Sequence, residues 1–379
     1  MSIQRILHIF FFFFVGIIVI TLIVLWNRQS DSFVLPSGDE QEARLVIEDG
    51  EVVGTVTDLV YGENADEELA QAIRDAIADA PTTKDIEIKD IYITDGLKHS
   101  VPLDEIVGGG PEKDGIPSID APVFISISEA ESFLDDSEPG ISVSLNGIDR
   151  FYPFQIMVWH EIVNDTFDDT AVLVTYCPLC LTGIVFDPLV LGEYVEFGTS
   201  GKLWQSNLVM YDRKTDSLWS QVLGEAIAGE MTGTALSTFP SDRVRFGDWK
   251  EQYPQGEVLS RDTGALRTYG FDPYGSYYTD NSQIFSDVST FDDRLQRKDV
   301  VMGLVIDGVA KAYYPPSIQE EGIVQDTVGS RVLEAEYFAD LDVVRIYEVL
   351  ETGERVQLNP VSGFWFSWVA AHPDTLLYQ

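Results

Sequence analysis

The stretch NGIDRFY, residues 146–152, recurs in the second half of the chain as DGVAKAY, residues 307–313. In the first copy, Asn146-Gly147 suits a turn that needs positive φ at both central positions. The flanking residues alternate between apolar and polar, so residues 141–153 are predicted to form a β-hairpin. The match between the two stretches suggests an internal duplication.

Further parts of the repeat follow each hairpin. IVNDT at 162–166 falls without any gap on IVQDT at 323–327. Later residues pair at equal spacing, Trp249 with Trp368 and Pro254 with Pro373. We therefore expect two related units, the first enlarged by an insertion around residues 180–245. Short β-rich runs separated by Gly, Pro, Asn and Asp dominate these units, so the expected fold class is mainly β, a β-rich α+β ectodomain.

The charge balance excludes one class of partner. The chain of 379 residues has 63 acidic and 24 basic residues, which gives a net charge of −39. Such a charge repels phosphate backbones, so we expect no nucleic-acid binding. An acidic surface of this kind is typical of an extracellular or high-salt protein, where ions screen the self-repulsion.

The N-terminus is predicted to form one transmembrane helix. Residues 6–26 are apolar apart from His8, Gly16 and Thr21, and a helix of about 20 residues crosses a bilayer. The residues at 25–28 (LWNR) offer no small-x-small cleavage site, which favours an uncleaved signal anchor. We expect a single-pass protein of the cell membrane, with its C-terminal domain in an extracytoplasmic compartment that permits disulfides.

Composition and local patterns divide the chain into four segments. They are a transmembrane signal anchor (1–28), a stalk and small α+β region (29–114), a first β-rich unit with both cysteines (115–296) and a second, shorter related unit (297–379). Within the second segment the patterns predict a hairpin at 43–57, a helix at 65–80 and a strand at 85–94. Short helices are expected at 153–162, near Asp248 and near Ser367.

The only two cysteines of the chain lie in TYCPLC, residues 175–180. Residues 171–176 are predicted to form a strand, so Cys177 and Cys180 lie on the turn that leaves it, close enough for a disulfide or for two bonds to one metal. A thioredoxin-type site would place this motif at the start of a helix, whereas residues 181–186 look like another strand. A zinc ribbon would need a second Cys-x-x-Cys, which the chain lacks.

His160 lies upstream of the cysteines and is the first candidate to join them. If residues 154–162 are helical, Met157 and His160 share a face and can point together toward Cys177. Cysteine, histidine and methionine are the ligand set of a copper site, and cysteine and histidine with a carboxylate suit zinc. The predicted metal ligands are Cys177, Cys180, His160 and Met157, with copper or zinc as the possible cofactor.

The same residues allow a second chemistry, nucleophilic catalysis, and a structural alternative. Cys177 could be a nucleophile with His160 as its base and Asn164 or Asp165 as the group that orients the base. Glu161 and Asn164 are lesser candidates. Alternatively, the two cysteines form one structural disulfide, as is common in exported domains.

The second unit serves as an internal control for these candidates. It has Glu321 at the position of His160, and Phe338 and Leu341 near the positions of the cysteines. The shared scaffold is therefore expected to form without the histidine and the thiols. Their presence in the first unit favours a functional role for these three residues. The aspartate of the Asp-Thr pair occurs in both units, so Asp165 is expected to be structural.

Several stretches together resemble a known family. They are KDGIPSID (113–120), WHEIVND (159–165), TYCPLC (175–180), LVMYD (208–212) and SLWSQ (217–221). They resemble the prokaryotic family catalogued as domain of unknown function 3179, over roughly the last three quarters of the chain. The resemblance implies an exported or membrane-anchored protein and names no activity. It also implies glycine where this chain has Leu181, and members without the second cysteine, which leaves Cys177 and His160 as the durable pair.

The function expected from the sequence is a metal-binding or redox-linked accessory protein at the membrane surface. One alternative is a thiol-dependent enzyme that uses Cys177 with His160. Another is a structural or adhesive ectodomain with a Cys177–Cys180 disulfide. The membrane is the only partner that the sequence indicates. Two stretches that mix charge with aromatics, at 260–264 and 272–277, are expected to be surface turns with core aromatics.

Overall fold

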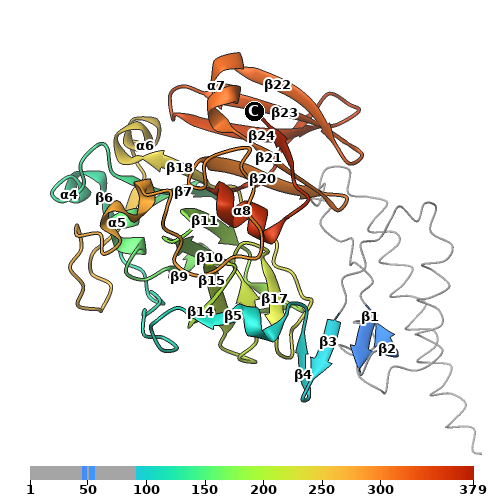
Figure 1. Cartoon of the computed structure of the whole chain (residues 1–379). Helices are drawn as coiled ribbons and strands as arrows, with labels where there is room; N and C mark the ends of the chain where they lie inside the picture. The colour runs from blue at the N-terminus through green and yellow to red at the C-terminus, as the bar shows by residue number, and fades with distance from the viewer. Residues whose placement is uncertain (1–44, 49–50, 56–90) are drawn as a thin grey trace, which may run out of the picture. The chain divides into compact units, whose positions relative to one another are not determined.

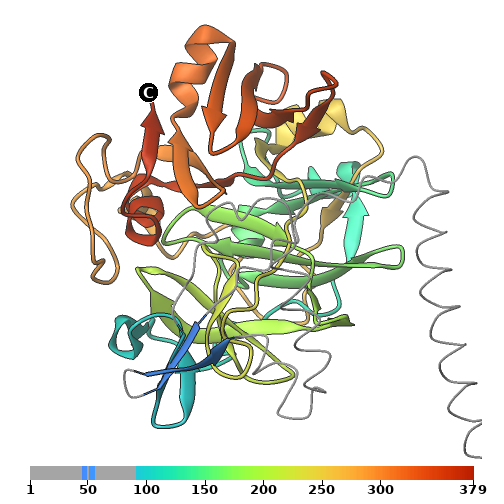
Figure 2. The ribbon, with the colours of Figure 1, turned by 90° about the vertical axis from the view of Figure 1, so that its right-hand side faces the viewer.

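The computed structural model describes residues 45–48, 51–55 and 91–379. This part of the chain is mainly β, as predicted, and its strands form sheets of nine, seven, five, four and two strands (Figures 1 and 2). The predicted membrane span at 6–26 and the predicted helix at 65–80 lie outside the described residues. Within the described ranges, no helix is long and apolar enough to cross a membrane.

The hairpin predicted around Asn146-Gly147 is present. Strand β7 (Pro139–Leu145) pairs antiparallel with β8 (Ile148–Pro153), and Asn146 and Gly147 turn the chain with φ angles of 55° and 78°. Three more strands complete a five-stranded sheet, namely β18 (Asp242–Arg245), β19 (Glu257–Leu259) and β6 (Phe124–Ser126).

The second copy of the motif forms the same hairpin. Strand β20 (Val300–Ile306) pairs with β21 (Val309–Tyr313) around Asp307 and Gly308, whose φ angles are 50° and 72°. In each copy a tyrosine and a basic residue of the hairpin both bind an aspartate on a following strand. These residues are Tyr152, Arg150 and Asp165 in the first copy, and Tyr313, Lys311 and Asp326 in the second. The aspartates therefore have a structural role.

Strand pairing has the same register in both copies. Asp242 of β18 lies opposite Ser142 of β7, and Val361 of β26 (Val361–Phe364) lies opposite Gly303 of β20. Strand β19 runs parallel to β8 just as β27 (Leu376–Tyr378) runs parallel to β21. The first residues of matching strands are a constant 161 positions apart. Pro139 corresponds to Val300 at the start of this series, and Thr182 corresponds to Val343 at its end.

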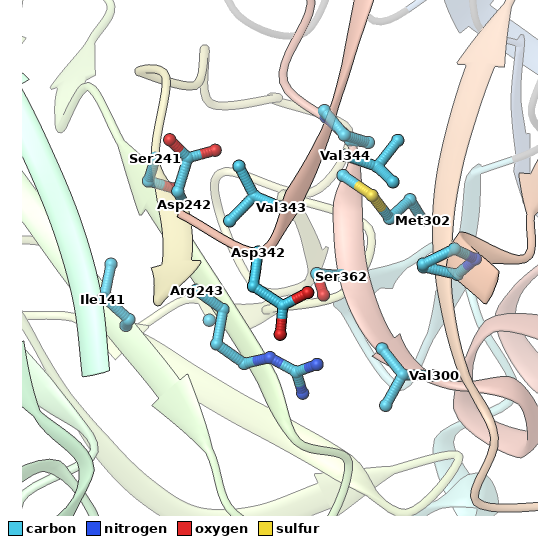
Figure 3. Close-up of a pocket in the computed structure, with 13 residues that line it drawn as sticks. Ile141, Ser241, Asp242, Arg243, Val300, Met302, Asp342, Val343, Val344 and Ser362 are labelled. Atoms are coloured by element: carbon cyan, nitrogen blue, oxygen red, sulfur yellow. The ribbon is translucent and has the colours of Figure 1, made fainter. Parts of the chain in front are cut away.

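One sheet joins strands of both copies. Its order is β27-β21-β20-β26-β11-β10-β9, in which β9 (Ile162–Phe167), β10 (Thr170–Cys177) and β11 (Thr182–Phe186) come from the first unit. Gly183 of β11 lies opposite Ser362 of β26 at the junction. A small cavity lies where the two units meet (Figure 3).

The remaining strands form three sheets. The nine-stranded sheet contains β1 (Leu45–Glu48), β2 (Glu51–Thr55), β3 (Ile91–Thr94), β4 (Leu97–His99), β5 (Ile106–Gly108), β14 (Phe197–Trp204), β15 (Asn207–Asp212), β16 (Leu218–Ser220) and β17 (Glu225–Ala228). The four-stranded sheet contains β22 (Ile323–Val328), β23 (Arg331–Phe338), β24 (Val343–Val349) and β25 (Arg355–Gln357). Strands β12 (Leu189–Val190) and β13 (Glu193–Tyr194) form the last pair. Strands β3 to β5, which precede residue 115, thus belong to a sheet of the first unit.

Helices are few and short in the described ranges. They are α4 (Ile127–Ala130), α5 (Phe154–Met157), α6 (Phe246–Gln252), α7 (Pro315–Glu321) and α8 (Trp365–Ala371), with 3-10 turns η1 (Leu103–Glu105) and η2 (Gly275–Thr279). The helix predicted at 153–162 is only the single turn α5. Glu161 takes a φ of 59° before β9 begins, and this conformation ends any helix. Met157 is the last residue of α5, and His160 lies in the turn that follows it.

Candidate functional site

The two cysteines lie on the turn between strands β10 and β11, as the sequence predicts. Cys177 ends β10 opposite Thr182, and the backbone N–H of Cys180 donates to the carbonyl of Cys177 at 3.2 Å. Leu181 closes the turn with a φ of 53°. Both cysteines are free thiols, with exposed fractions of 1% and 0%.

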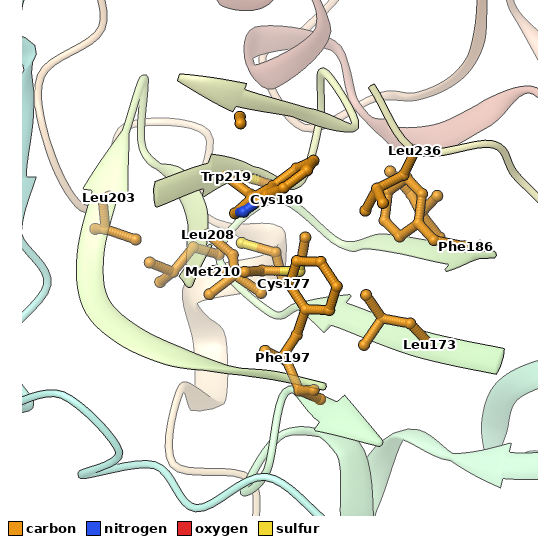
Figure 4. Close-up of a cluster of buried hydrophobic side chains, with 14 of the residues drawn as sticks. Leu173, Cys177, Cys180, Phe186, Phe197, Leu203, Leu208, Met210, Trp219 and Leu236 are labelled. Atoms are coloured by element: carbon orange, nitrogen blue, oxygen red, sulfur yellow. The ribbon is translucent and has the colours of Figure 1, made fainter. Parts of the chain in front are cut away.

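Apolar side chains surround both sulfurs. Figure 4 shows Cys177 and Cys180 among Phe197, Met210 and Trp219, which belong to one buried cluster. Burial raises the pKa of the Cys177 thiol well above its ordinary value, and the neighbouring Cys180 raises it further. Cys177 is therefore a protonated thiol at neutral pH.

Cys180 has a different environment because polar groups reach its sulfur. Its thiol donates to the carbonyl of Ser206 at 3.1 Å. Burial alone would raise the pKa of this thiol. The nearby donor side chains of Cys177, Ser367 and Asn207 outweigh burial and hold the pKa of Cys180 below its ordinary value. The pair is therefore asymmetric, with Cys180 the more easily ionised sulfur.

Ser367 is the least satisfied of these donors. Its side chain lies on α8 with an exposed fraction of 1%, and its hydroxyl oxygen has no hydrogen-bond partner in the structure. A buried hydroxyl without a partner costs roughly 1–3 kcal/mol. A thiolate at Cys180 would give this hydroxyl an acceptor, whereas the neutral thiol donates to the carbonyl of Ser206.

A buried amide network fixes Asn207 beside Cys180. The Asn207 amide donates to Thr182 at 3.2 Å and to the side-chain oxygen of Gln221 at 3.3 Å, and its own oxygen accepts from the N–H of Val222 at 3.1 Å. The amide nitrogen of Gln221 donates to Thr175 at 3.0 Å. Because these groups are buried and paired with one another, Asn207 is held in one orientation.

Glu161 brings a carboxyl group to the other cysteine. The residue is buried, with an exposed fraction of 7%, and the carbonyl of Glu161 accepts from the N–H of Tyr176 at 2.7 Å. Burial raises the pKa of the Glu161 carboxyl well above its ordinary value, and the proximity of Cys177 raises it further. A carboxylic acid beside a high-pKa thiol is an arrangement that can pass a proton.

A long connection covers the cysteine turn. Residues 261–299 contain only the 3-10 turn η2, and the Tyr277 hydroxyl of that turn donates to the carbonyl of Leu179 at 2.9 Å. The Lys298 ammonium lies 3.4 Å from the Tyr277 ring centroid. Burial raises the pKa of Tyr274, and Glu161 raises it further. Tyr274 and Tyr277 come from a stretch predicted to be a surface turn with core aromatics, and both pack against the cluster that contains the cysteines.

His160 has partners away from the sulfurs. Its Nδ1 lies 2.7 Å from the carbonyl oxygen of Pro117, and its Nε2 lies 2.6 Å from the Tyr269 hydroxyl. Burial lowers the pKa of His160, so the ring is neutral at pH 7. Because both ring nitrogens are engaged, neither is directed at Cys177 in this structure, and the pairing of Cys177 with His160 stays a prediction.

The remaining predicted site residues also have other surroundings. Met157 is buried in a second apolar cluster that contains neither cysteine. The Asn164 amide donates to Asp120 at 2.7 Å and to the carbonyl of Phe197 at 2.9 Å, so it joins two chain segments. In the described part of the chain, no group of three or more His, Cys, Asp or Glu side chains is placed to hold a metal.

Sequence reasoning missed Asn207, Gln221, Ser367 and Tyr277. A signal was present for one of them, because Gln221 ends the motif SLWSQ. The motif alone could not reveal that its glutamine reaches the cysteine turn through Asn207.

The comparison with protein families identifies the chain at this point. The family model described as protein of unknown function (DUF3179) matches residues 113–360, and the chain belongs to this family. The match covers the cysteine turn, Glu161 and the amide network. Searches of curated proteins and of solved structures gave no match.

Proposed function

We propose that this member of the DUF3179 family is a redox-linked protein whose Cys177 and Cys180 interconvert between dithiol and disulfide. The supporting observation is the asymmetry of the two buried thiols. Donor groups lower the pKa of Cys180, whereas burial and the adjacent Cys180 raise the pKa of Cys177. A thiol with a lowered pKa next to a thiol with a raised pKa is the asymmetry that thiol–disulfide exchange uses.

The exchange is written here in the direction that reduces the protein disulfide. An external thiolate attacks the sulfur of Cys180, the Cys177–Cys180 bond breaks, and Cys177 leaves with the electron pair. A second external thiolate then attacks the external sulfur of the mixed disulfide, and Cys180 leaves as a thiolate. The two external thiolates become one disulfide, and the protein gains two electrons.

Glu161 would supply the proton in the first step. Its pKa is raised by burial and by Cys177, so the carboxyl carries a proton that it can give to the leaving sulfur of Cys177. In the opposite direction the Glu161 carboxylate takes this proton back. Glu161 is therefore the residue that couples the exchange to proton transfer.

Access to the sulfurs requires a movement, because both are buried. The η2 turn covers the cysteine turn through the hydrogen bond from Tyr277 to Leu179. Long connections without strands are often active-site lids. We include opening of this segment as a step of the proposed function.

The two units are proposed to derive from one duplicated ancestor. Support comes from the constant spacing of their strands and from the matching Tyr–Asp hydrogen bonds. The cysteine-free second unit has Phe338 and Leu341 at the positions of the two cysteines. We infer that the dithiol was added to the first copy of a structural frame.

The location is also a proposal. We infer that residues 6–26 anchor the chain in the cell membrane as a single pass, with the described domain on the extracytoplasmic side. The apolar run and the acidic composition support this location. Protease treatment of intact cells, compared with lysed cells, tests it, because an extracytoplasmic domain is digested in both.

A trapping experiment tests the exchange. The Cys177→Ser variant keeps Cys180, so oxidised glutathione should form a stable mixed disulfide that intact mass reveals. The Cys180→Ser variant should react more slowly, because its remaining thiol has a raised pKa. Equal reactivity of the two variants, or no mixed disulfide in either, would contradict the proposal.

A further inference from the structure

A small cavity lined by residues of both units lies against Gly183 of β11 and Ser362 of β26. Its volume is about 80 Å³. Because a single water molecule needs roughly 10–15 Å³ of such space, the cavity can hold a ligand of a few heavy atoms. Figure 3 shows the side chain of Arg243 extending from β18 into it, with Val300 and Met302 on the opposite wall.

The cavity offers hydrogen-bond donors that have no protein partner. Arg243, Ser241 and Ser362 line it, and their side chains make no hydrogen bond or ion pair with any described residue. Burial lowers the pKa of Arg243, yet an arginine stays protonated at neutral pH. The cavity therefore contains a half-buried cation and two hydroxyls without an acceptor.

The acceptors that line the cavity are already paired. Asp242 binds the Arg345 guanidinium at 2.6 Å. Asp342 accepts from the Tyr337 hydroxyl at 2.8 Å and lies 3.5 Å from the Arg245 guanidinium. Asp342 also attracts Arg243 electrostatically, without a direct ion pair. The unpaired side chains of the cavity are thus hydrogen-bond donors, and a ligand would have to supply the acceptor.

The opposite wall has a different character. Val300, Met302 and Val344 come from the second unit and are apolar. Arg243 is the second residue of β18 in the first unit, and Ser362 is the second residue of the equivalent strand β26 in the second unit. The second unit therefore has an uncharged serine where the first has Arg243. The cavity consequently has one polar end, formed by Arg243, the serines and the two paired aspartates, and one apolar end.

We propose that this cavity is a binding site for a short aliphatic carboxylate. The carboxylate accepts two hydrogen bonds from the Arg243 guanidinium, whose planar donors match it, and further ones from the serine hydroxyls. The hydrocarbon part lies against Val300 and Met302. Inorganic phosphate or sulfate fits less well, because its charged oxygens would contact the apolar wall without a partner.

Calorimetric titration of the full chain with sodium butyrate tests the proposal, with inorganic phosphate as the second probe. We expect one butyrate per chain and phosphate binding at least tenfold weaker. The Arg243→Gln variant should lose at least tenfold in butyrate affinity. Arg213→Gln is the control, because Arg213 does not line the cavity and pairs with Asp120 at 2.8 Å; its butyrate affinity should stay unchanged.

A second variant keeps the test decisive if Arg243→Gln does not fold. Ser362→Ala removes one hydroxyl donor and should weaken butyrate binding at least tenfold, since a lost hydrogen bond to a charged group is worth about 1.5–3 kcal/mol and about 1.4 kcal/mol is tenfold in affinity. Absence of butyrate binding by the wild-type chain would overturn the proposal. So would phosphate binding as tight as butyrate binding, or an affinity that neither variant changes.

Discussion

Glu161 and Gly322 lie 161 positions apart, at the turn into β9 and at the turn into β22, and both have positive φ, 59° and 80°. Glycine adopts this conformation at no steric cost, whereas other residues pay roughly 1–2 kcal/mol. The turn into β9 thus has a strained, buried carboxyl group, whereas the turn into β22 has the residue that suits this conformation. Because strain of this kind clusters at functional sites, the comparison supports a role for Glu161 beside Cys177.

Replacement of Glu161 by Gln should change the pH dependence of stability. The folded pKa of Glu161 is raised, so the unfolded chain ionises first, and the native state loses stability as pH rises from about 4.5 through the folded pKa. Glu161→Gln should therefore be more stable than the wild type at pH 7 and similar to it at pH 4. Urea unfolding of both proteins across this range measures the difference; a difference independent of pH would contradict the assignment.

Replacement of Tyr277 by Phe should expose the dithiol more often. The change removes the hydrogen bond to Leu179, which contributes about 1 kcal/mol, so the rate of thiol alkylation should rise severalfold. Tyr278→Phe is the matched control, because the Tyr278 hydroxyl is buried without a partner and its loss should not speed alkylation. Equal alkylation rates in the two variants would exclude the η2 turn as the cover.

Replacement of His160 by Ala should affect stability and not thiol reactivity. The ring joins Pro117 to Tyr269, so its loss should cost about 1–3 kcal/mol. The folded pKa of His160 is lowered, so its contribution is present above pH 6.5 and is lost as pH falls through the folded pKa. Iodoacetamide alkylation of Cys177 should keep the wild-type rate and pH profile; a slower rate would restore the thiol-enzyme hypothesis with His160 as base.

Replacement of Ser367 by Ala should raise the pKa of Cys180. The serine hydroxyl is one of the donors that favour the Cys180 thiolate, and alanine leaves the sulfur with one donor fewer. Ultraviolet absorbance of the thiolate, titrated against pH in the Cys177→Ser background, measures the shift. Ser217→Ala is a suitable control, because Ser217 is also buried but its hydroxyl binds Met231 and Thr215. An unchanged titration in Ser367→Ala would remove this residue from the site.

Much of the fold was readable from local patterns. The turn at Asn146-Gly147 and the strands on either side of Cys177 and Cys180 follow from turn chemistry and alternation, which act over a few residues. The short helices α6 and α8 lie where the tryptophan segments predicted them. The short helix expected around 153–162 is present as α5 but ends at Met157, because β9 pairs with β10 from Ile162 onward.

The site could be predicted only in part. The sequence identified Cys177 and Cys180, and named Glu161 as a lesser candidate. It could not place Ser367 or Tyr277, which lie far along the chain and reach the cysteine turn only through the packing of α8 and η2. It also grouped His160 and Met157 with the sulfurs by spacing, whereas their side chains face other partners. Spacing shows which side chains share a face of one element and not what packs against that face.

The reduction potential of the Cys177–Cys180 pair tests the central claim most directly. The full chain would be equilibrated with glutathione buffers of increasing oxidation, quenched with a thiol-blocking reagent and analysed by intact mass. The account predicts a cooperative two-electron transition between dithiol and disulfide within the range of exchangeable pairs, above about −300 mV. Two thiols that persist in every buffer, or a disulfide that no thiol reduces without unfolding, would contradict it.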